Sequence, residues 1–157
     1  MPTSRQRVTT CLWFDTDAEE AALFYTSILE NSRITAISRR PGGQALTVEF
    51  ELAGIAFQAL NGGPHFKLSE ACSLSVACGT QEDIDRLWKT LVADGGEEGQ
   101  CGWLKDRFGL SWQIVPTVLP VLLGDPDPAK AQRTMAAMLK MSKLDIAALE
   151  RAHAGDA

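Results

Sequence analysis

Cysteine and histidine carry the most reactive side chains in this sequence, and their spacing restricts the chemistry they can perform. The four cysteines stand at Cys11, Cys72, Cys78 and Cys101, and no two of them form a CxxC pair. Neither a zinc knuckle nor a thioredoxin-type redox site is therefore indicated. In a reducing compartment we expect four free thiols, mostly buried as small apolar side chains.

Cys101 has a further possible role, because the surrounding stretch GQCGW (99–103) is rich in glycine and tryptophan and could border a cavity. A cysteine nucleophile needs a base that helps to form the thiolate. The chain has two histidines, His65 after a Gly-Gly-Pro turn and His153 near the C-terminus, and neither has an obvious claim to that role.

Composition excludes several classes of partner. The chain has 157 residues, of which 45% are hydrophobic and 22% charged, as in ordinary globular proteins. Its net charge of −5 argues against a nucleic-acid surface, which would need clustered Lys and Arg. No apolar run approaches the roughly 18 residues of a membrane span, and MPTSR at the start lacks the apolar core of a secretory signal. We expect a cytoplasmic protein.

The elements that would position reactive groups occur in two similar series. Residues 8–14 read as a strand, and Thr16 to Glu19 matches a capping box that opens an amphipathic helix to about Glu30. Strands are predicted at 33–39, 45–52 and 55–60, the last two joined as a hairpin through Ala53-Gly54. A break at residues 61–64 follows.

The second series begins with a strand at 73–78 and a capping-box-like start at Thr80, 64 positions after Thr16. Its helix is expected to end at Gly95-Gly96, and residues 99–116 supply the returning strands around a turn at 106–109. Helices are expected at 129–140 and 144–151, packed on the domain or on a second subunit. This predicts an α+β fold with βαβββ modules at 1–63 and 64–117 and a C-terminal helical extension at 118–157, together one structural domain.

Two βαβββ units in tandem resemble the glyoxalase/bleomycin-resistance/dioxygenase superfamily, also called the vicinal oxygen chelate superfamily. Within it, four segments resemble the PhnB-like branch: LWFDTDAEEAALFYTSIL (12–29), ALNGGPHFK (59–67), CGWLKDRFGLSWQIVP (101–116) and AQRTMAAMLKMSKLDIAALE (131–150). Members of this branch often carry the label 3-demethylubiquinone-9 3-methyltransferase.

The resemblance also implies where a metal would sit. Metal-dependent members use two histidines and two glutamates, or close variants, from the first and last strands of each half. Those positions fall here on Thr9 or Thr10, near Gln58, on Ser73 and on Gln113. None of these is an imidazole or a carboxylate, so we predict no metal and no cofactor.

The methyltransferase label finds no support in the glycines. A nucleotide donor such as S-adenosylmethionine is normally held by a Gly-rich turn between a strand and a helix. Gly62-Gly63 and Gly95-Gly96 are the glycine pairs in question, and neither opens a helix after a strand in a GxGxxG context. We therefore interpret both pairs as turns or helix ends.

In the fold that the resemblance implies, the inward positions of the strands form a cleft. The candidates for its lining are polar but uncharged, or aromatic: Gln58, Asn61, Ser73, Ser75, Cys101, Trp103, Trp112 and Gln113. Such groups suit a small, partly apolar or aromatic ligand. Ser73 and Ser75 share one face of their strand by parity. Asp15, Asp106 and Arg107 are expected to be solvated turn residues.

Three functional hypotheses follow. The first is a metal-independent small-molecule-binding protein of the PhnB-like type, a homodimer as small members of the superfamily commonly are. The second is a metal-free enzyme acting on a quinone-like or aromatic substrate, in which Cys101 is a nucleophile or Gln58 and Gln113 orient a carbonyl group. The third is an interaction protein that uses its C-terminal helices. We favour the first, because charged catalytic groups are absent from the mapped positions.

Overall fold

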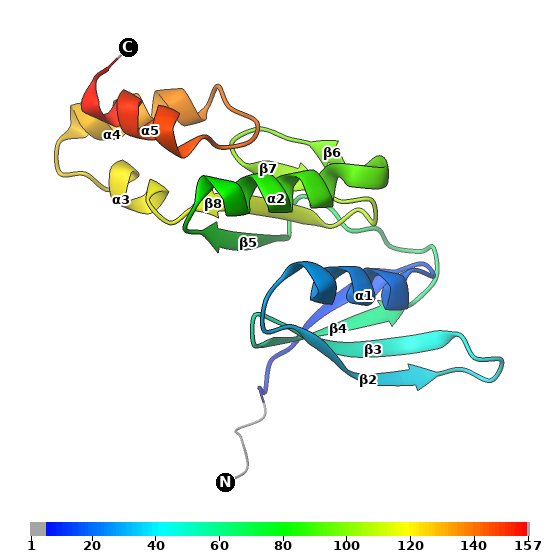
Figure 1. The fold of residues 1–157 in the computed structure, drawn as a ribbon. Helices are drawn as coiled ribbons and strands as arrows, with labels where there is room; N and C mark the ends of the chain where they lie inside the picture. Colours follow the sequence, from blue (N-terminus) through cyan, green and yellow to red (C-terminus); the bar gives the residue numbers. More distant parts are fainter. Residues whose placement is uncertain (1–5, 157) are drawn as a thin grey trace, which may run out of the picture. The chain divides into compact units, whose positions relative to one another are not determined.

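The computed structural model describes residues 6–156 and divides the chain into two compact units, Met1–Leu68 and Ser69–Ala157. Each unit holds a four-stranded sheet covered by one helix, as Figure 1 shows. Residues 1–5, on which the expected absence of a secretory signal rests, lie outside the described residues. Within residues 6–156, no helix is long and apolar enough to cross a membrane.

The first unit is one βαβββ module. Its elements are β1 (Thr10–Phe14), α1 (Ala18–Ile28), β2 (Arg33–Arg39), β3 (Ala45–Leu52) and β4 (Ile55–Asn61). The strands lie in the order β1-β4-β3-β2, with β1 parallel to β4 and the other pairs antiparallel. Ala53 and Gly54 both have positive φ, the conformation that a tight two-residue hairpin turn requires, so the predicted hairpin is confirmed.

The second unit repeats this order and adds three helices. Its elements are β5 (Ser73–Cys78), α2 (Gln81–Val92), the 3-10 turn η1 (Ala93–Gly95), β6 (Glu97–Glu98), β7 (Trp103–Lys105), β8 (Ser111–Pro116), α3 (Leu119–Leu123), α4 (Pro128–Met138) and α5 (Ile146–Ala154). The strand order β5-β8-β7-β6 matches that of the first sheet, with β5 parallel to β8. The predicted α+β fold of two βαβββ modules and a helical extension is confirmed.

The helix α1 starts differently from the prediction. Thr16 does not cap it: the N-cap residue is Asp17, whose side chain makes no capping hydrogen bond. Instead the buried Asn61, at the end of β4, accepts a hydrogen bond from the Ala18 N–H at 2.9 Å and donates one to the Ala45 carbonyl at 2.9 Å. A side chain 43 positions further along the sequence thus accepts a hydrogen bond from a free N–H group of the first turn of α1. The same side chain links α1 to its sheet.

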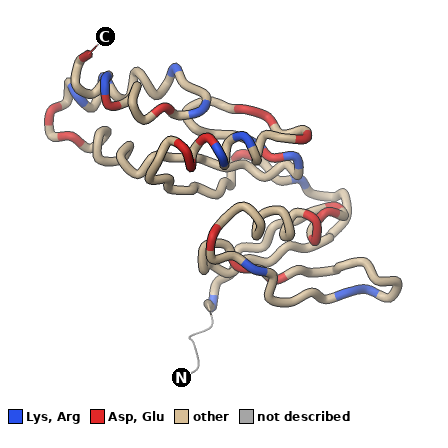
Figure 2. Tube along the Cα trace, in the orientation of Figure 1, with Lys and Arg blue, Asp and Glu red and all other residues tan. Residues whose placement is uncertain are grey.

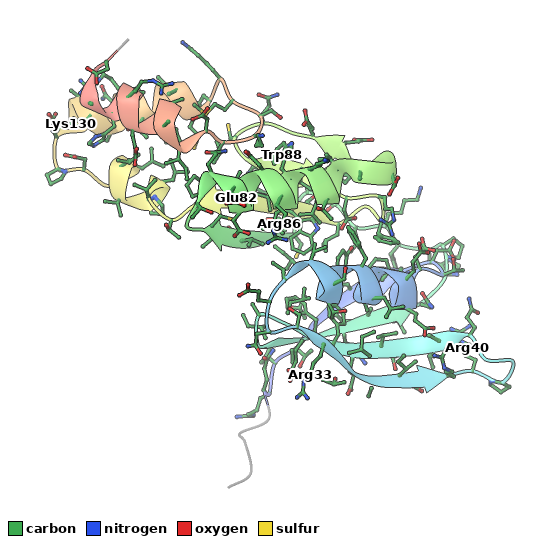
Figure 3. All side chains as sticks on the ribbon, in the orientation of Figure 1. Arg33, Arg40, Glu82, Arg86, Trp88 and Lys130 are labelled. Atoms are coloured by element: carbon green, nitrogen blue, oxygen red, sulfur yellow. The ribbon has the colours of Figure 1, made fainter. Side chains whose placement is uncertain are left out.

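In the second unit the predicted cap is confirmed. The Thr80 hydroxyl accepts a hydrogen bond from the Asp83 N–H, and α2 buries the apolar stripe that contains Trp88. Figure 3 shows Trp88 on the side of α2 toward β6, where its Nε1 donates to Glu98 at 2.7 Å. The helix ends at Val92, before the glycine pair that was expected to end it, because η1 intervenes.

The turn before β8 is built on a buried carboxylate. Asp106 is 2% exposed, so the expectation of a solvated turn residue is wrong. Its Oδ1 accepts hydrogen bonds from the Phe108 and Leu110 N–H groups, and its Oδ2 accepts one from Trp112 Nε1 at 2.9 Å. Gly109 takes the positive φ that closes the turn. Asp106 therefore fixes both the turn and the core tryptophan of β8.

The C-terminal helices pack on the second unit. Leu119, Leu122, Leu144 and Leu149 form their own buried cluster. The side chain of Gln81, at the start of α2, donates to the Leu144 carbonyl and accepts from the Ile146 N–H. Leu144 also packs so closely on Gly102 that a Cβ atom there would come within 3.0 Å of its Cδ1. The extension is thereby part of this unit's core.

We predict that Asp106→Asn lowers the free energy of unfolding by about 2 kcal/mol. Both carboxylate oxygens of Asp106 accept hydrogen bonds from N–H groups, and in asparagine an NH₂ group replaces one of these oxygens and faces an N–H donor. Urea denaturation followed by tryptophan fluorescence measures this, since the second unit holds three of the four tryptophans. Asp94→Asn, at an exposed position of the same unit, is the control and should change little. Equal stabilities of the two variants would contradict the assigned role of Asp106.

We also predict that Leu144→Ala costs about 3 kcal/mol of unfolding free energy, because Leu144 is fully buried between the extension and the rest of the unit. The matched control is Leu139→Ala, since Leu139 is 60% exposed at the end of α4. Chemical denaturation of both variants gives the comparison. A loss at Leu144 no larger than that at Leu139 would show that the extension does not contribute to this core.

Candidate functional site

The open face of the first sheet, opposite α1, carries a row of three reactive or polar side chains. Cys11 on β1 pairs in register with Gln58 on β4, and Gln58 pairs with Glu49 on β3. Their strand neighbours, such as Leu12 and Phe50, are buried on the helix side. Because side chains alternate along a strand, Cys11, Gln58 and Glu49 lie together on the other face.

A cleft of about 840 Å³ lies over this part of the first sheet. Its polar and small lining residues are Gln6, Thr9, Thr35, Glu49, Glu51, Gly54, Ala56 and Gln58. Sites for small organic molecules commonly measure about 300–1,000 Å³. The cleft is therefore large enough for a small organic molecule, and Gln58 forms part of its wall.

The charges in this cleft differ from the expectation of an uncharged lining. Glu51 pairs with Arg33 at 3.1 Å. The side-chain carboxylate of Glu49 makes no hydrogen bond or ion pair with any other residue in 6–156. Gln58 likewise has no side-chain hydrogen-bond partner within that range. The cleft thus contains one amide and one carboxylate whose bonding capacity is left for another molecule.

The sequence contained the signal for Glu49. The strand ALTVEFEL alternates apolar and polar residues, which predicts that Glu49 and Glu51 face away from the core. The metal-ligand positions implied by the superfamily resemblance lie on the first and last strands of each half, and β3 contributes none of these. Cys11 was missed because the first-strand position was assigned to Thr9 or Thr10. In the structure Thr10 pairs with Phe57, and Cys11 is the residue opposite Gln58.

The open face of the second sheet repeats the pattern with other residues. Ser75, Gln113 and Trp103 form a row across β5, β8 and β7, in the same relation as Cys11, Gln58 and Glu49. Gln113 Nε2 donates to the Ser73 hydroxyl at 2.9 Å. The structure thus brings four of the predicted site residues onto one sheet face.

A small hollow of about 110 Å³ lies beside this row, near Trp103 and Lys105. The Lys105 ammonium pairs with Glu70 at 2.5 Å. Ser111 also lines the hollow, and its buried hydroxyl has no hydrogen-bond partner among the described residues. The hollow is large enough for a few atoms only, so the first-unit cleft is the better candidate site.

Three predicted site residues have other roles. Trp112 follows Ser111 and precedes Gln113, so it lies on the helix side of its sheet, where it is 1% exposed. Asn61 is likewise buried on the helix side, where its side chain accepts a hydrogen bond from the first turn of α1. Adjacent residues of one strand cannot share a face, and for this reason Trp112 is corrected to a core residue. Cys101 lies in a loop, with its N–H bonded to the Met141 carbonyl.

The thiols are less buried than expected. Of the four, Cys78 alone is buried, Cys101 is half-buried, and Cys11 and Cys72 are exposed. Burial, together with nearby Asp83, raises the pKa of Cys78 to about 12, so this thiol stays protonated at neutral pH. Cys11 is exposed, yet neighbouring atoms displace part of its hydration, and this desolvation raises the pKa of its thiol above the usual value. Neither environment favours a thiolate nucleophile.

The donor groups fit a divalent metal poorly. Within residues 6–156, no three His, Cys, Asp or Glu side chains are grouped closely enough to hold a metal ion. The row on the first sheet offers one thiol, one neutral amide and one carboxylate, and the row on the second sheet adds only a hydroxyl and an amide. Zn²⁺, Ni²⁺ and Fe²⁺ sites normally use several imidazole, thiolate or carboxylate ligands.

The chain is similar to several known proteins. The family described as 3-demethylubiquinone-9 3-methyltransferase matches residues 6–115. A PhnB protein from Bacillus cereus is 34% identical, with a TM-score of 0.67, and the match covers 71% of this chain and 100% of that one. No curated protein sequence matches.

Two more distant structures share the fold. Protein PA1353 from Pseudomonas aeruginosa is 20% identical, with a TM-score of 0.59, and the match covers 71% of this chain and 97% of that one. The fosfomycin resistance protein FosX from Listeria monocytogenes is 14% identical, with a TM-score of 0.50 and coverages of 70% and 89%. The chain therefore belongs to the 3-demethylubiquinone-9 3-methyltransferase family, as does the PhnB protein from Bacillus cereus to which it is similar.

Proposed function

We propose that this protein binds a small organic molecule in the first-unit cleft without a resident metal ion, and that it acts as a cytoplasmic homodimer. The observation that carries the proposal is Gln58, whose side-chain amide lines a cleft of about 840 Å³ and has no hydrogen-bond partner in residues 6–156. A primary amide both donates and accepts hydrogen bonds, so it can orient a hydroxyl or carbonyl group of a ligand.

The physical argument concerns the cost of leaving such an amide unbonded. A half-buried amide without a protein partner depends on water or on a ligand for its hydrogen bonds. A ligand that matches the amide replaces that water while its apolar part covers Ala56 and the neighbouring backbone. Both effects favour a small aromatic molecule with at least one hydroxyl group, such as a phenol or a hydroquinone.

Methyl transfer, which the family description names, is not part of this proposal. Gly62 packs against the ring of Trp13, since a Cβ atom there would lie 2.3 Å from the ring. Gly96 follows η1 and packs against the backbone of Val92, the last residue of α2, since a Cβ atom there would lie 2.6 Å from the Val92 Cα. Both glycines serve close packing, and neither begins a helix that could hold a nucleotide.

A metal-free enzyme that uses Cys101 is the second candidate. One observation favours it, because Cys101 has a φ of +58°, and strained backbone is often found at functional sites. Against it, the Cys101 and Gly102 N–H groups bond to the Met141 and Ser142 carbonyls, so the strain is explained by the anchoring of the C-terminal extension. His153 pairs with Asp125 at 2.9 Å and so has another role.

We predict that hydroquinone, phenol or catechol raises the melting temperature of the protein, and that Gln58→Leu weakens the binding by about tenfold because one hydrogen-bonding group is lost. Thermal shift and ligand-observed NMR titration measure both effects in the presence of EDTA. Gln44→Leu makes the same chemical change at an exposed position outside the cleft and is the control. If all three phenols bind Gln58→Leu as tightly as the wild type, Gln58 is not the recognition group.

Thiol labelling separates binding from cysteine catalysis. At neutral pH we expect iodoacetamide to label Cys72 first and Cys11 more slowly, and to leave Cys78 unmodified, because the pKa of about 12 leaves almost no thiolate there. Cys101 should react no faster than free cysteine. Peptide mass spectrometry over a time course gives the four rates. A Cys101 that reacts much faster than free cysteine would instead support the enzymatic alternative.

A further inference from the structure

We propose that the first-unit cleft selects small organic cations, such as protonated amines and amidines, through the carboxylate of Glu49. This inference rests on the proposed function, since it concerns the same cleft, and it adds the charge class of the ligand. Glu49 lines the cleft and stands in register with Gln58, so the two side chains project beside each other from neighbouring strands. Directly opposed residues of an antiparallel pair have Cβ atoms about 5 Å apart.

The first reason is that, among the described residues of this unit, no basic side chain pairs with the Glu49 carboxylate. The arginines of β2 and the following turn have other partners, which are Glu51 for Arg33, Glu19 for Arg39 and the Asn61 carbonyl for Arg40. Figure 3 shows Arg33 at the start of β2 and Arg40 just beyond its end, and Figure 2 shows basic residues at both ends of this strand. The Glu49 carboxylate itself has no ion-pair or hydrogen-bond partner within the described residues.

The second reason is the difference between the two carboxylates of the cleft. Glu51 is next but one to Glu49 on β3 and lines the same cleft, yet its charge is balanced by Arg33 at 3.1 Å. Among the described lining residues, Glu49 is therefore the carboxylate whose charge no ion pair balances. A half-buried carboxylate attracts a cation more strongly than an exposed one, because less water screens the interaction.

The third reason concerns the size and chemistry of the remaining lining. A cleft of about 840 Å³ is much larger than a bare metal ion, and residues 6–156 provide no group of three metal ligands around Glu49. The hydroxyls of Thr9 and Thr35 and the amide of Gln58 supply further acceptors for N–H groups. An ammonium or amidinium group has several N–H donors, so a small organic cation matches this set better than a metal ion does.

The test uses three probes of nearly the same shape and different charge: benzylammonium, benzyl alcohol and benzoate. Their dissociation constants are measured by NMR titration on the full chain at neutral pH and low salt. We expect benzylammonium to bind most tightly and benzoate most weakly. Glu49→Gln should weaken benzylammonium binding by about tenfold and leave benzyl alcohol binding unchanged.

Glu30→Gln is the matched control, because it makes the same change in net charge at an exposed position outside the cleft. It should not affect the affinity for benzylammonium. Equal affinities for the three probes, or unchanged benzylammonium binding by Glu49→Gln, would overturn the charge assignment and leave binding of phenols at Gln58 untouched. A loss of affinity that is equal in Glu30→Gln and Glu49→Gln would also overturn it, since the effect would then be one of net charge only.

Discussion

The covering of one face of each sheet by a single helix is the constraint on which the rest of the structure depends. Side chains alternate along a strand, so each residue buried under α1 or α2 sends its neighbours to the opposite face. In the first unit, Phe57 and Ala59 on β4 are buried, and Gln58 between them must face the cleft. In the second unit, Trp112 and Ile114 place Gln113 in the same way. The packing of the two cores therefore determines that Gln58 and Gln113 face the open side of their sheets.

The strand β4 shows how fold and site share residues. Asn61, three positions after Gln58, faces the helix side and bonds to the first turn of α1. The same strand thus holds the helix in place with the amide of Asn61 and carries the unbonded amide of Gln58 in the cleft. In β8 the corresponding buried residue is Trp112, whose Nε1 donates a hydrogen bond to the buried Asp106 carboxylate of the preceding turn. Buried polar groups with complete hydrogen bonding rigidify the elements that carry the open-face residues.

Local patterns predicted the elements well, and long-range contacts explain what they could not predict. Strands 33–39, 45–52 and 73–78 were found with the observed bounds, because alternation and turn residues are local signals. The cap of α1 was missed because Asn61 lies far away in the sequence. Asp106 was taken as solvated because turn composition does not reveal a tryptophan partner. In the site, parity groups the two serines correctly, whereas Glu49 lies on β3, which holds none of the ligand positions that the superfamily resemblance implies.

The central claim is that this family member recognises its ligand with neutral and singly charged side chains, without a metal ion. The most direct measurement is elemental analysis of untagged protein, after incubation with Zn²⁺, Ni²⁺ and Mn²⁺ and removal of free metal by gel filtration. We expect far less than one equivalent of each metal, because the rows around Gln58 and Gln113 lack the ligands to retain one. One equivalent of a divalent ion that is retained through gel filtration would contradict this claim.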